Sequence, residues 1–408
     1  MWLPTDGRPC PCHVLAALGR AMLALAVVLA APAGAAGSRS AFATDAGFRV
    51  VKNLVGYIGS PASPILELPD GSLLGTSSTG GDLGKGLVFR LTPGGDLTVV
   101  HSFTGNPDDG ESPIGSLVRT PDGDVYGTTT SGGTNDWGTV FRISPDGVYA
   151  TATGLFPWGG VGPSGGLTLG DDGNLYGTTT GGGSSYSGTL YRISPSGSHA
   201  LLYSFGADGR NPCGTLTSHG PGRLVGTTAY GGAFGNGTLF EFDPATGTVT
   251  TLHSFGAAEG AIPWSSPIAG PDGTLYGVTS SGGTHEAGTL YRYSAGTGVQ
   301  PIFSFPSPPT GGSASALVVD SESNLYGTWW GGGSDGAGSV FRFSGSGVFT
   351  TLHSFSGTDG AFPRAPLSWA RDGTLLGSTS GQRFPGSVFR MTTEGALTTI
   401  RLFDDPDG

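Results

Sequence analysis

Apolar and polar positions alternate along this chain in short runs, and no stretch repeats apolar residues at the helical period. Four kinds of run follow one another in a fixed order: a brief apolar run such as 65–68, a Leu-Tyr-Gly-Thr phrase, a run centred on a Phe or Tyr, and a run of the type Leu252–Phe255. Short runs of this kind predict β-strands. Asp-Gly pairs such as Asp122-Gly123 separate the first two runs, and they predict tight hairpin turns in which both turn residues tolerate positive φ.

The glycine of the Leu-Tyr-Gly-Thr phrase marks a tandem repeat. It recurs at spacings of 52, 50, 49, 51, 50 and 50 residues, at Gly75, Gly127, Gly177, Gly226, Gly277, Gly327 and Gly377. Four strands per unit in seven units predict an all-β fold, a seven-bladed β-propeller of four-stranded antiparallel blades over 48–403. A closed ring also removes the exposed sheet edges that an open row of hairpins would leave.

The two ends of the repeat region carry one strand too many. Runs of the fourth kind number eight, from Arg49–Val55 to Leu397–Phe403, whereas the other kinds number seven. The surplus strand either extends a blade or joins the first blade to the last. We expect a clasp of the second kind near the N-terminal segment.

Composition separates this chain from a disordered one. Glycine (77) and proline (29) make up about a quarter of its 408 residues, which without a repeat would indicate low complexity. Charged residues are only 12% and aromatic residues are 10%, whereas disordered acidic chains are rich in charge and poor in aromatics. Many short strands joined by glycine-rich turns account for both observations.

The first 35 residues have the features of a signal peptide. Arg8 and Arg20 supply positive charge, residues 21–31 form an apolar run of 11, and 33–35 is a small-residue cleavage site. The run is too short to span a bilayer, which makes an uncleaved anchor the weaker alternative. We expect a signal peptide over 1–35, a flexible segment over 36–47 and a tail over 404–408. The sequence therefore predicts a protein that is secreted or periplasmic.

Charge excludes several partners. Without residues 1–35 the chain keeps 17 basic and 29 acidic residues, a net charge of −12, which repels phosphate backbones and anionic lipids. We expect a monomer that binds no nucleic acid, does not insert into a membrane after signal cleavage, and holds no cofactor or metal. The lone thiol of that region, Cys213, occupies the place that Ile114 has in another unit, which predicts a buried apolar role.

The repeat phrases resemble a known family. The order P-x-x-x-L, DGNLYGTTxxGG, GTLYRISPxG and TLHSF is similar to the GloVer-type (choice-of-anchor) tandem repeat of exported bacterial proteins, over about 48–403. More distantly, the unit resembles NHL and gluconolactonase-like propeller repeats. The resemblance implies export, often with a C-terminal surface-sorting signal, and carries no activity. Because 404–408 is not an apolar tail, free secretion or a periplasmic location is expected rather than surface anchoring.

Residues that occur in one unit only are the candidates for function. In a propeller of this kind the second-to-third-strand loops and the exits of the fourth strands share one face, where loops on a rigid scaffold can vary. Aromatic side chains gather in these segments, at Trp137, Tyr186, Tyr230, Phe234, Trp264, Trp329 and Trp330. Such rings suit stacking on sugars, so the first hypothesis is an extracellular binding module for glycans or a partner protein. Ordinary loop packing is the simpler explanation of the same rings, since exposed apolar residues are common on any surface.

The second hypothesis is a carbohydrate-active or lactonase-like hydrolase or lyase on the same face. Its candidate catalytic residues are His285 and Glu286 as acid and base, with Asp136 opposite. No established catalytic or calcium-loop motif supports it.

Side chains that recur in many units are better explained as scaffold. They are the Thr after the marker glycine, the Arg after the third-strand aromatic as a salt-bridged row, and a fourth-strand position, shared by His101, His253 and His353, that accepts any large side chain.

Overall fold

The computed structural model describes residues 59, 61, 63–154, 159–307, 313–380 and 386–403. Contacts divide the chain into a unit 1–56 and a unit 57–408, and all described residues belong to the second. The expected signal peptide 1–35, the segment 36–47, the surplus strand Arg49–Val55 and the tail 404–408 lie outside the described residues and stay predictions.

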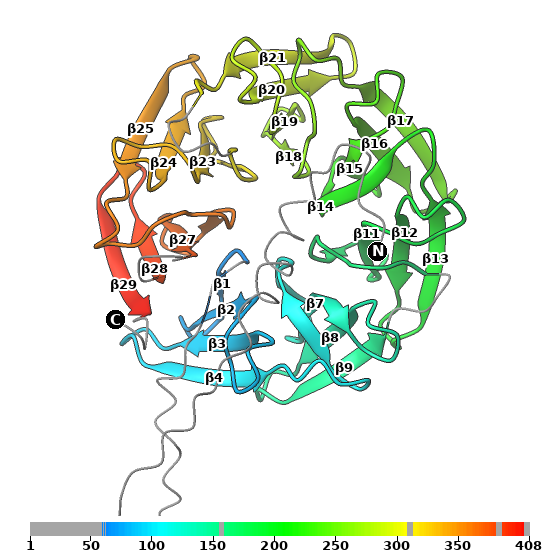
Figure 1. Cartoon of the computed structure of the whole chain (residues 1–408), viewed down its shortest axis with the longest axis vertical. Helices are drawn as coiled ribbons and strands as arrows, with labels where there is room; N and C mark the ends of the chain where they lie inside the picture. Colours follow the sequence, from blue (N-terminus) through cyan, green and yellow to red (C-terminus); the bar gives the residue numbers. More distant parts are fainter. Residues whose placement is uncertain are drawn as a thin grey trace, which may run out of the picture. The chain divides into compact units, whose positions relative to one another are not determined.

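Seven antiparallel sheets are arranged around one axis (Figure 1). Six have four strands and the second has five, and each is built from strands that are consecutive in the chain. The described residues contain no α-helix, so no helix among them is long and apolar enough to cross a membrane. The prediction of an all-β, seven-bladed β-propeller is confirmed.

The strands fall into seven blades, each numbered outward from the axis. Blade 1 has β1 (Leu66–Glu67), β2 (Leu73–Ser77), β3 (Leu87–Leu91) and β4 (Leu97–Ser102). Blade 2 has β5 (Gly110–Pro113), β6 (Val118–Arg119), β7 (Val125–Gly132), β8 (Thr139–Ile143) and β9 (Tyr149–Gly154). Blade 3 has β10 (Thr168–Leu169), β11 (Leu175–Thr179), β12 (Thr189–Ile193) and β13 (His199–Ser204). Blade 4 has β14 (Arg210–Ser218), β15 (Leu224–Tyr230), β16 (Thr238–Asp243) and β17 (Thr248–Ser254). Blade 5 has β18 (Ile268–Ala269), β19 (Leu275–Val278), β20 (Thr289–Ser294) and β21 (Gly298–Ser304). Blade 6 has β22 (Val318–Val319), β23 (Leu325–Trp329), β24 (Ser339–Phe343) and β25 (Phe349–Ser354). Blade 7 has β26 (Ser368–Trp369), β27 (Leu375–Thr379), β28 (Gly386–Met391) and β29 (Leu397–Phe403).

The Asp-Gly turns differ in type from the expected two-residue hairpin. In blade 1 the N–H of Gly71 donates to the carbonyl of Leu68 (2.9 Å), and the N–H of Leu68 donates to the carbonyl of Ser72 (2.8 Å). Of the Asp-Gly pair only Gly71 has positive φ (80°), although both residues tolerate it. The loop is therefore three residues long, a type I turn followed by a left-handed glycine, and the Asp70 carboxylate accepts the N–H of Ser72.

The core lies between neighbouring blades rather than at the axis. Each apolar cluster combines side chains of two successive blades, and the cluster that closes the ring joins Phe89 of blade 1 to Val388 and Phe403 of blade 7. Ser368 also donates to the carbonyl of Ile65 (2.5 Å) across the same boundary. Among the described residues, the first and last blades therefore meet by packing, and both have four strands of their own.

Neighbouring blades are also tied by a hydrogen bond from the threonine after the marker glycine. Its hydroxyl donates to a carbonyl that precedes the inner strand of the next blade, in the pairs Thr76–Pro113, Thr128–Gly165, Thr227–Ser265 and Thr328–Ala365. These threonines are buried. They belong to the scaffold, as the recurrence predicted.

Candidate functional site

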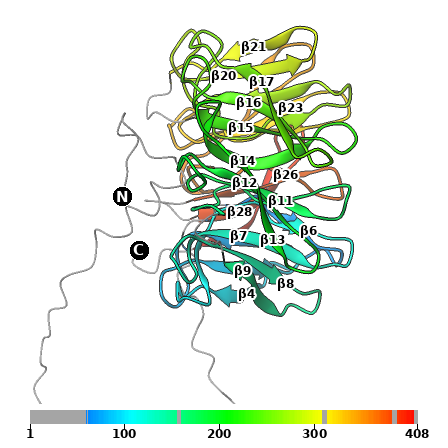
Figure 2. The same ribbon diagram turned by 90° about the vertical axis from the view of Figure 1, so that its right-hand side faces the viewer.

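The two faces of the ring carry different connections, and the ring is seen edge-on in Figure 2. The turns that join first to second and third to fourth strands lie on one face, called here the turn face; Gly123 approaches Pro145 there. The other face, called the loop face, holds the second-to-third-strand loops and the connections between blades. In these connections the N–H of Ser112 donates to the carbonyl of Lys85 (2.8 Å), and the N–H of Ile262 donates to that of Asn236 (2.9 Å).

The second-to-third-strand loops of blades 1 to 6 share one backbone conformation. In blades 1 to 6 each reads Gly-Gly followed by four residues and a glycine, and the third of the four, called here the tip residue, has positive φ. Glycine is the tip residue in blades 1, 4 and 6, at Gly84, Gly235 and Gly336. Asp136, Tyr186 and Glu286 hold the same position in blades 2, 3 and 5, with φ of 57°, 51° and 54°. Different side chains are therefore displayed on the same loop around the ring.

The structure does not bring the three catalytic candidates together. Asp136 and Glu286 are tip residues of different loops, with blades 3 and 4 between them. The Asp136 carboxylate accepts the N–H of Gly132 in its own loop (2.9 Å). The side chains of His285 and Glu286 are exposed and make no hydrogen bond to another described residue.

Three successive blades carry aromatic side chains on these loops. Tyr186 of blade 3 is 86% exposed, and Phe234 of blade 4, one residue before its tip glycine, is 66% exposed. Trp137 of blade 2 is half-buried directly after its tip residue. Two of the three rings are thus open to solvent on neighbouring loops.

The remaining aromatic candidates lie closer to the axis, at blade boundaries. Tyr230 is the last residue of β15, and its ring lies edge-to-face with Trp264 at the entry of blade 5, with ring centroids 6.0 Å apart. Trp330 follows β23 and has the Arg364 guanidinium 4.6 Å from its ring centroid. Trp329, in contrast, is 7% exposed and packs on Phe305, so it belongs to the core of blades 5 and 6.

The histidine position of the outer strand has a role that the sequence reasoning missed. Nε2 of His101, His253 and His353 lies 3.1, 2.9 and 2.6 Å from a carboxylate oxygen of Asp109, Glu259 and Asp359 respectively. In blade 3, Tyr203 donates to Asp208 in the same way. Each acid also accepts a backbone N–H of its own connection, so the pair fastens the blade-to-blade connection. The sequence did contain a signal for this role: in each of these four units an Asp or Glu follows the His or Tyr in the connection to the next blade.

Hydrogen bonds lower the pKa of one of these carboxylates, Asp109. Burial alone would raise the pKa of Asp109. Tyr149 and Thr104 donate to it and hold the pKa of its carboxyl below the ordinary value. The Asp109 carboxylate therefore has its hydrogen-bond partners within the scaffold.

The arginine row lies on the turn face, and three of its six arginines form the predicted salt bridges, whereas Arg292 donates to Gln300 instead. Nε of Arg142 lies 2.6 Å from Asp124, and Arg90 and Arg390 pair with the hairpin Asp of their blades. In blade 4 the charges are exchanged: Glu241 stands in the row, and Arg223 lies 3.6 Å from it.

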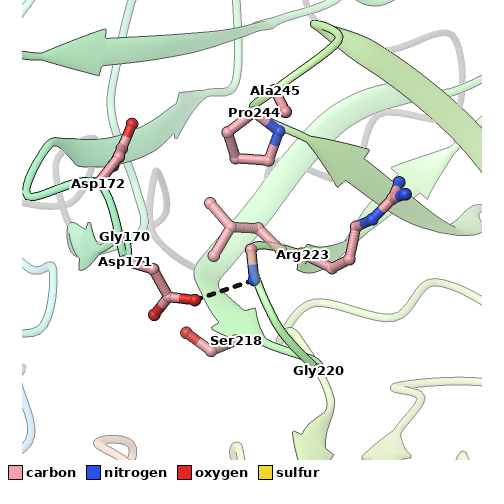
Figure 3. A pocket seen from close by; sticks show the side chains of 10 residues that line it. Gly170, Asp171, Asp172, Ser218, Gly220, Arg223, Pro244 and Ala245 are labelled. Carbon is pink, nitrogen blue, oxygen red and sulfur yellow. Dashed lines mark hydrogen bonds between the residues drawn. The ribbon is translucent and has the colours of Figure 1, made fainter.

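A pocket of about 190 Å³ opens on the turn face between blades 3 and 4 (Figure 3). Its charged groups already have partners: Asp171 accepts the N–H of Gly222 (2.9 Å), Asp172 accepts from Tyr176, and Arg223 pairs with Asp243 (3.1 Å). Each charged side chain of the pocket therefore already has a hydrogen-bond or salt-bridge partner within the protein.

Metal-ligating side chains do not converge within the described ranges. There, no group of three or more His, Cys, Asp or Glu side chains could hold a metal ion. Cys213 is 1% exposed, as its alignment with Ile114 predicted.

Fold and loop geometry together define a β-propeller repeat protein. The family model described as the Gloeobacter/Verrucomicrobia repeat matches residues 31–233 and 215–408. The chain belongs to this family, and the resemblance inferred from its repeat phrases is confirmed. No curated protein matches the chain significantly.

Solved structures show the same fold at low sequence identity. A puromycin-hydrolyzing peptidase of Mycobacterium tuberculosis is 14% identical with a TM-score of 0.55; the match covers 86% of this chain and 57% of the peptidase. A protein described as a 6-phosphogluconolactonase, from Bacteroides uniformis, is 15% identical with a TM-score of 0.55, covering 80% and 94%. A gluconolactonase of Xanthomonas campestris is 14% identical with a TM-score of 0.42, covering 67% and 84%. This chain thus spans little more than half of the peptidase, and the likeness concerns the fold alone.

Proposed function

We propose that this chain is an exported binding module that holds a glycan on its loop face. The observation that carries the proposal is Tyr186, which stands at a tip position with φ of 51° and leaves its ring 86% exposed. The export part of the proposal rests on the signal-peptide features of residues 1–35.

Tyr186 lowers the stability of the free protein in two ways. A left-handed conformation costs a non-glycine residue about 1–2 kcal/mol. The exposed ring recovers none of this by packing, and the equivalent loops use Gly84, Gly235 and Gly336. A strained and exposed aromatic residue is best explained by a contact made outside the chain.

A glycan is the ligand class that suits the neighbouring side chains. Phe234 presents a second exposed ring on the next loop, and Trp137 lies on the loop before. Rings with an apolar face stack on the C–H faces of sugars, and the Tyr hydroxyl can bond to sugar hydroxyls. A row of rings on successive loops would contact successive units of an oligosaccharide.

The test compares two substitutions at equivalent tip positions. Tyr186→Gly and Glu286→Gly relieve the same backbone strain, but only the first removes a ring. Screened on a glycan array and then titrated with the best oligosaccharide, wild type and Glu286→Gly should bind alike, and Tyr186→Gly should bind at least tenfold more weakly. Equal binding by Tyr186→Gly, or no glycan bound by the wild type, would refute the proposal. Hydrolysis of the oligosaccharide by the wild type but not by Glu286→Gly would instead support the enzyme hypothesis.

A further inference from the structure

Arg364 occupies a sheltered position on the loop face. It lies in the connection that enters blade 7, four residues before β26 (Ser368–Trp369), the strand nearest the axis. Trp330, at the end of β23 in blade 6, lies across the blade boundary with its ring centroid 4.6 Å from the guanidinium carbon. Phe362 closes the same group edge-to-face with Trp330, at a centroid distance of 6.3 Å.

The charge of Arg364 has no counter-ion in the described part of the chain. Its Nε is buried without a hydrogen-bond partner there. Burial lowers the pKa of Arg364, and no neighbouring charge offsets this effect. Arg142 and Arg390 are paired with Asp124 and Asp372. Nε of Arg192 and Arg342 is also buried without a partner there, so the contact with the Trp330 ring is what sets Arg364 apart.

Partial burial of an unpaired cation is unfavourable unless something compensates. Stacking on an indole contributes about 0.5–2 kcal/mol, but it uses the face of the guanidinium and leaves the N–H groups at its edge unused. Those N–H groups match the two oxygens of a carboxylate in a bidentate geometry, which a lysine cannot reproduce. The guanidinium beside Trp330 therefore lacks an acceptor for the N–H groups at its edge, and a planar anion would be a suitable acceptor.

We propose that Arg364 and Trp330 form a subsite for a sugar that carries a carboxylate, such as a uronate unit of an acidic oligosaccharide. This inference rests on the proposed glycan binding and specifies its chemistry. The net negative charge of the chain does not oppose it at physiological ionic strength, because screening limits exposed charges to a range of about 8 Å.

The experiment titrates purified protein with a uronate oligosaccharide and with its uncharged methyl ester. The wild type should bind the acid at least tenfold more tightly than the ester. Arg364→Gln should remove this preference and leave ester binding unchanged, whereas Arg364→Lys should restore it only in part. Arg119→Gln removes one charge from an exposed site at the turn face and should bind as the wild type does. Circular dichroism confirms that each variant is folded.

Several outcomes would overturn the inference. They are equal affinity of the wild type for acid and ester, a preference that survives in Arg364→Gln, and tighter binding of a sulfated analogue than of the uronate. Binding of both oligosaccharides that depends on Tyr186 but shows no preference would overturn this inference alone. Loss of all glycan binding in the wild type would overturn the proposed function as well.

Discussion

Nε2 of His353 lies 2.6 Å from a carboxylate oxygen of Asp359, six residues further along the chain, and this contact holds the connection between blades 6 and 7. Asp359 also accepts the N–H and the hydroxyl of Ser356. The relationship recurs with other residues in blades 1, 3 and 4. The same carboxylate thus orders its own turn and anchors it to the outer strand.

Replacing Asp359 by Asn should lower stability in a pH-dependent way. Burial raises the pKa of Asp359, but the hydrogen bonds from Ser356 and His353 outweigh it and hold that pKa below the ordinary value. A depressed pKa contributes stability that is present above the unfolded-state value, near 4, and is lost as pH falls through the folded-state value. We expect Asp359→Asn to lower the free energy of unfolding by about 1–2 kcal/mol at pH 7 and by much less near pH 3. Urea unfolding at both pH values measures the free energy of unfolding of the variant and the wild type. Glu322→Gln, at an exposed position, is the control. A loss of stability that does not depend on pH would contradict the explanation.

Thr128→Val should destabilise the protein, whereas Thr178→Val should not. The Thr128 hydroxyl donates to the carbonyl of Gly165 (3.0 Å). A valine at this position would leave that carbonyl without its donor and lower the free energy of unfolding by about 1–2 kcal/mol. The Thr178 hydroxyl is buried without a partner among the described residues, and the register of β14 in the next blade shifts between Cys213 and Thr217. Its removal should change stability by less than about 0.5 kcal/mol or raise it. Thermal unfolding distinguishes the two, and equal losses would show that the inter-blade hydrogen bond contributes nothing.

Tyr191→Phe should stabilise blade 3. The ring is fully buried and its hydroxyl has no hydrogen-bond partner in the described part of the chain, while burial raises the pKa of Tyr191. Phe holds the same position in five blades, at Phe89, Phe141, Phe240, Phe341 and Phe389. We expect a gain of about 1 kcal/mol in the free energy of unfolding, measured by urea titration. A loss instead would reveal a partner for the hydroxyl, such as an ordered water.

The repeat made the fold predictable from the sequence, because seven copies of one pattern give the strand order and the blade number independently of any single residue. The turn type was not predictable to the same degree. Asp122-Gly123 is compatible with both a two-residue and a three-residue hairpin, and the closing hydrogen bond between Thr120 and Asp124 decides between them.

The candidate site was predictable only in part. The sequence singled out Trp330 and Tyr186 because they differ from the other copies, and it placed both on the loop face. It could not separate Trp329, which turns into the core, from Trp330, which stays at the boundary. Nor could it show that Tyr186 stands at a left-handed position, because the side chain itself does not encode φ.

Gly127→Ala should be among the most destabilising single substitutions, although Gly127 has an ordinary strand conformation. A Cβ at Gly127 would lie 2.3 Å from Cζ of Phe141, which crosses the glycine to reach Leu117, so the cost comes from contact and not from φ. Overpacking of this kind costs about 1–3 kcal/mol or more, since neither the strand nor the ring can move far. Gly296→Ala is the matched control, because a Cβ there meets nothing within 4 Å. The double variant Gly127→Ala/Phe141→Leu should lose less than the sum of its single losses, because the smaller side chain makes room for the methyl group. Additive losses in urea unfolding would show that the marker glycine is required for a reason other than the crossing ring.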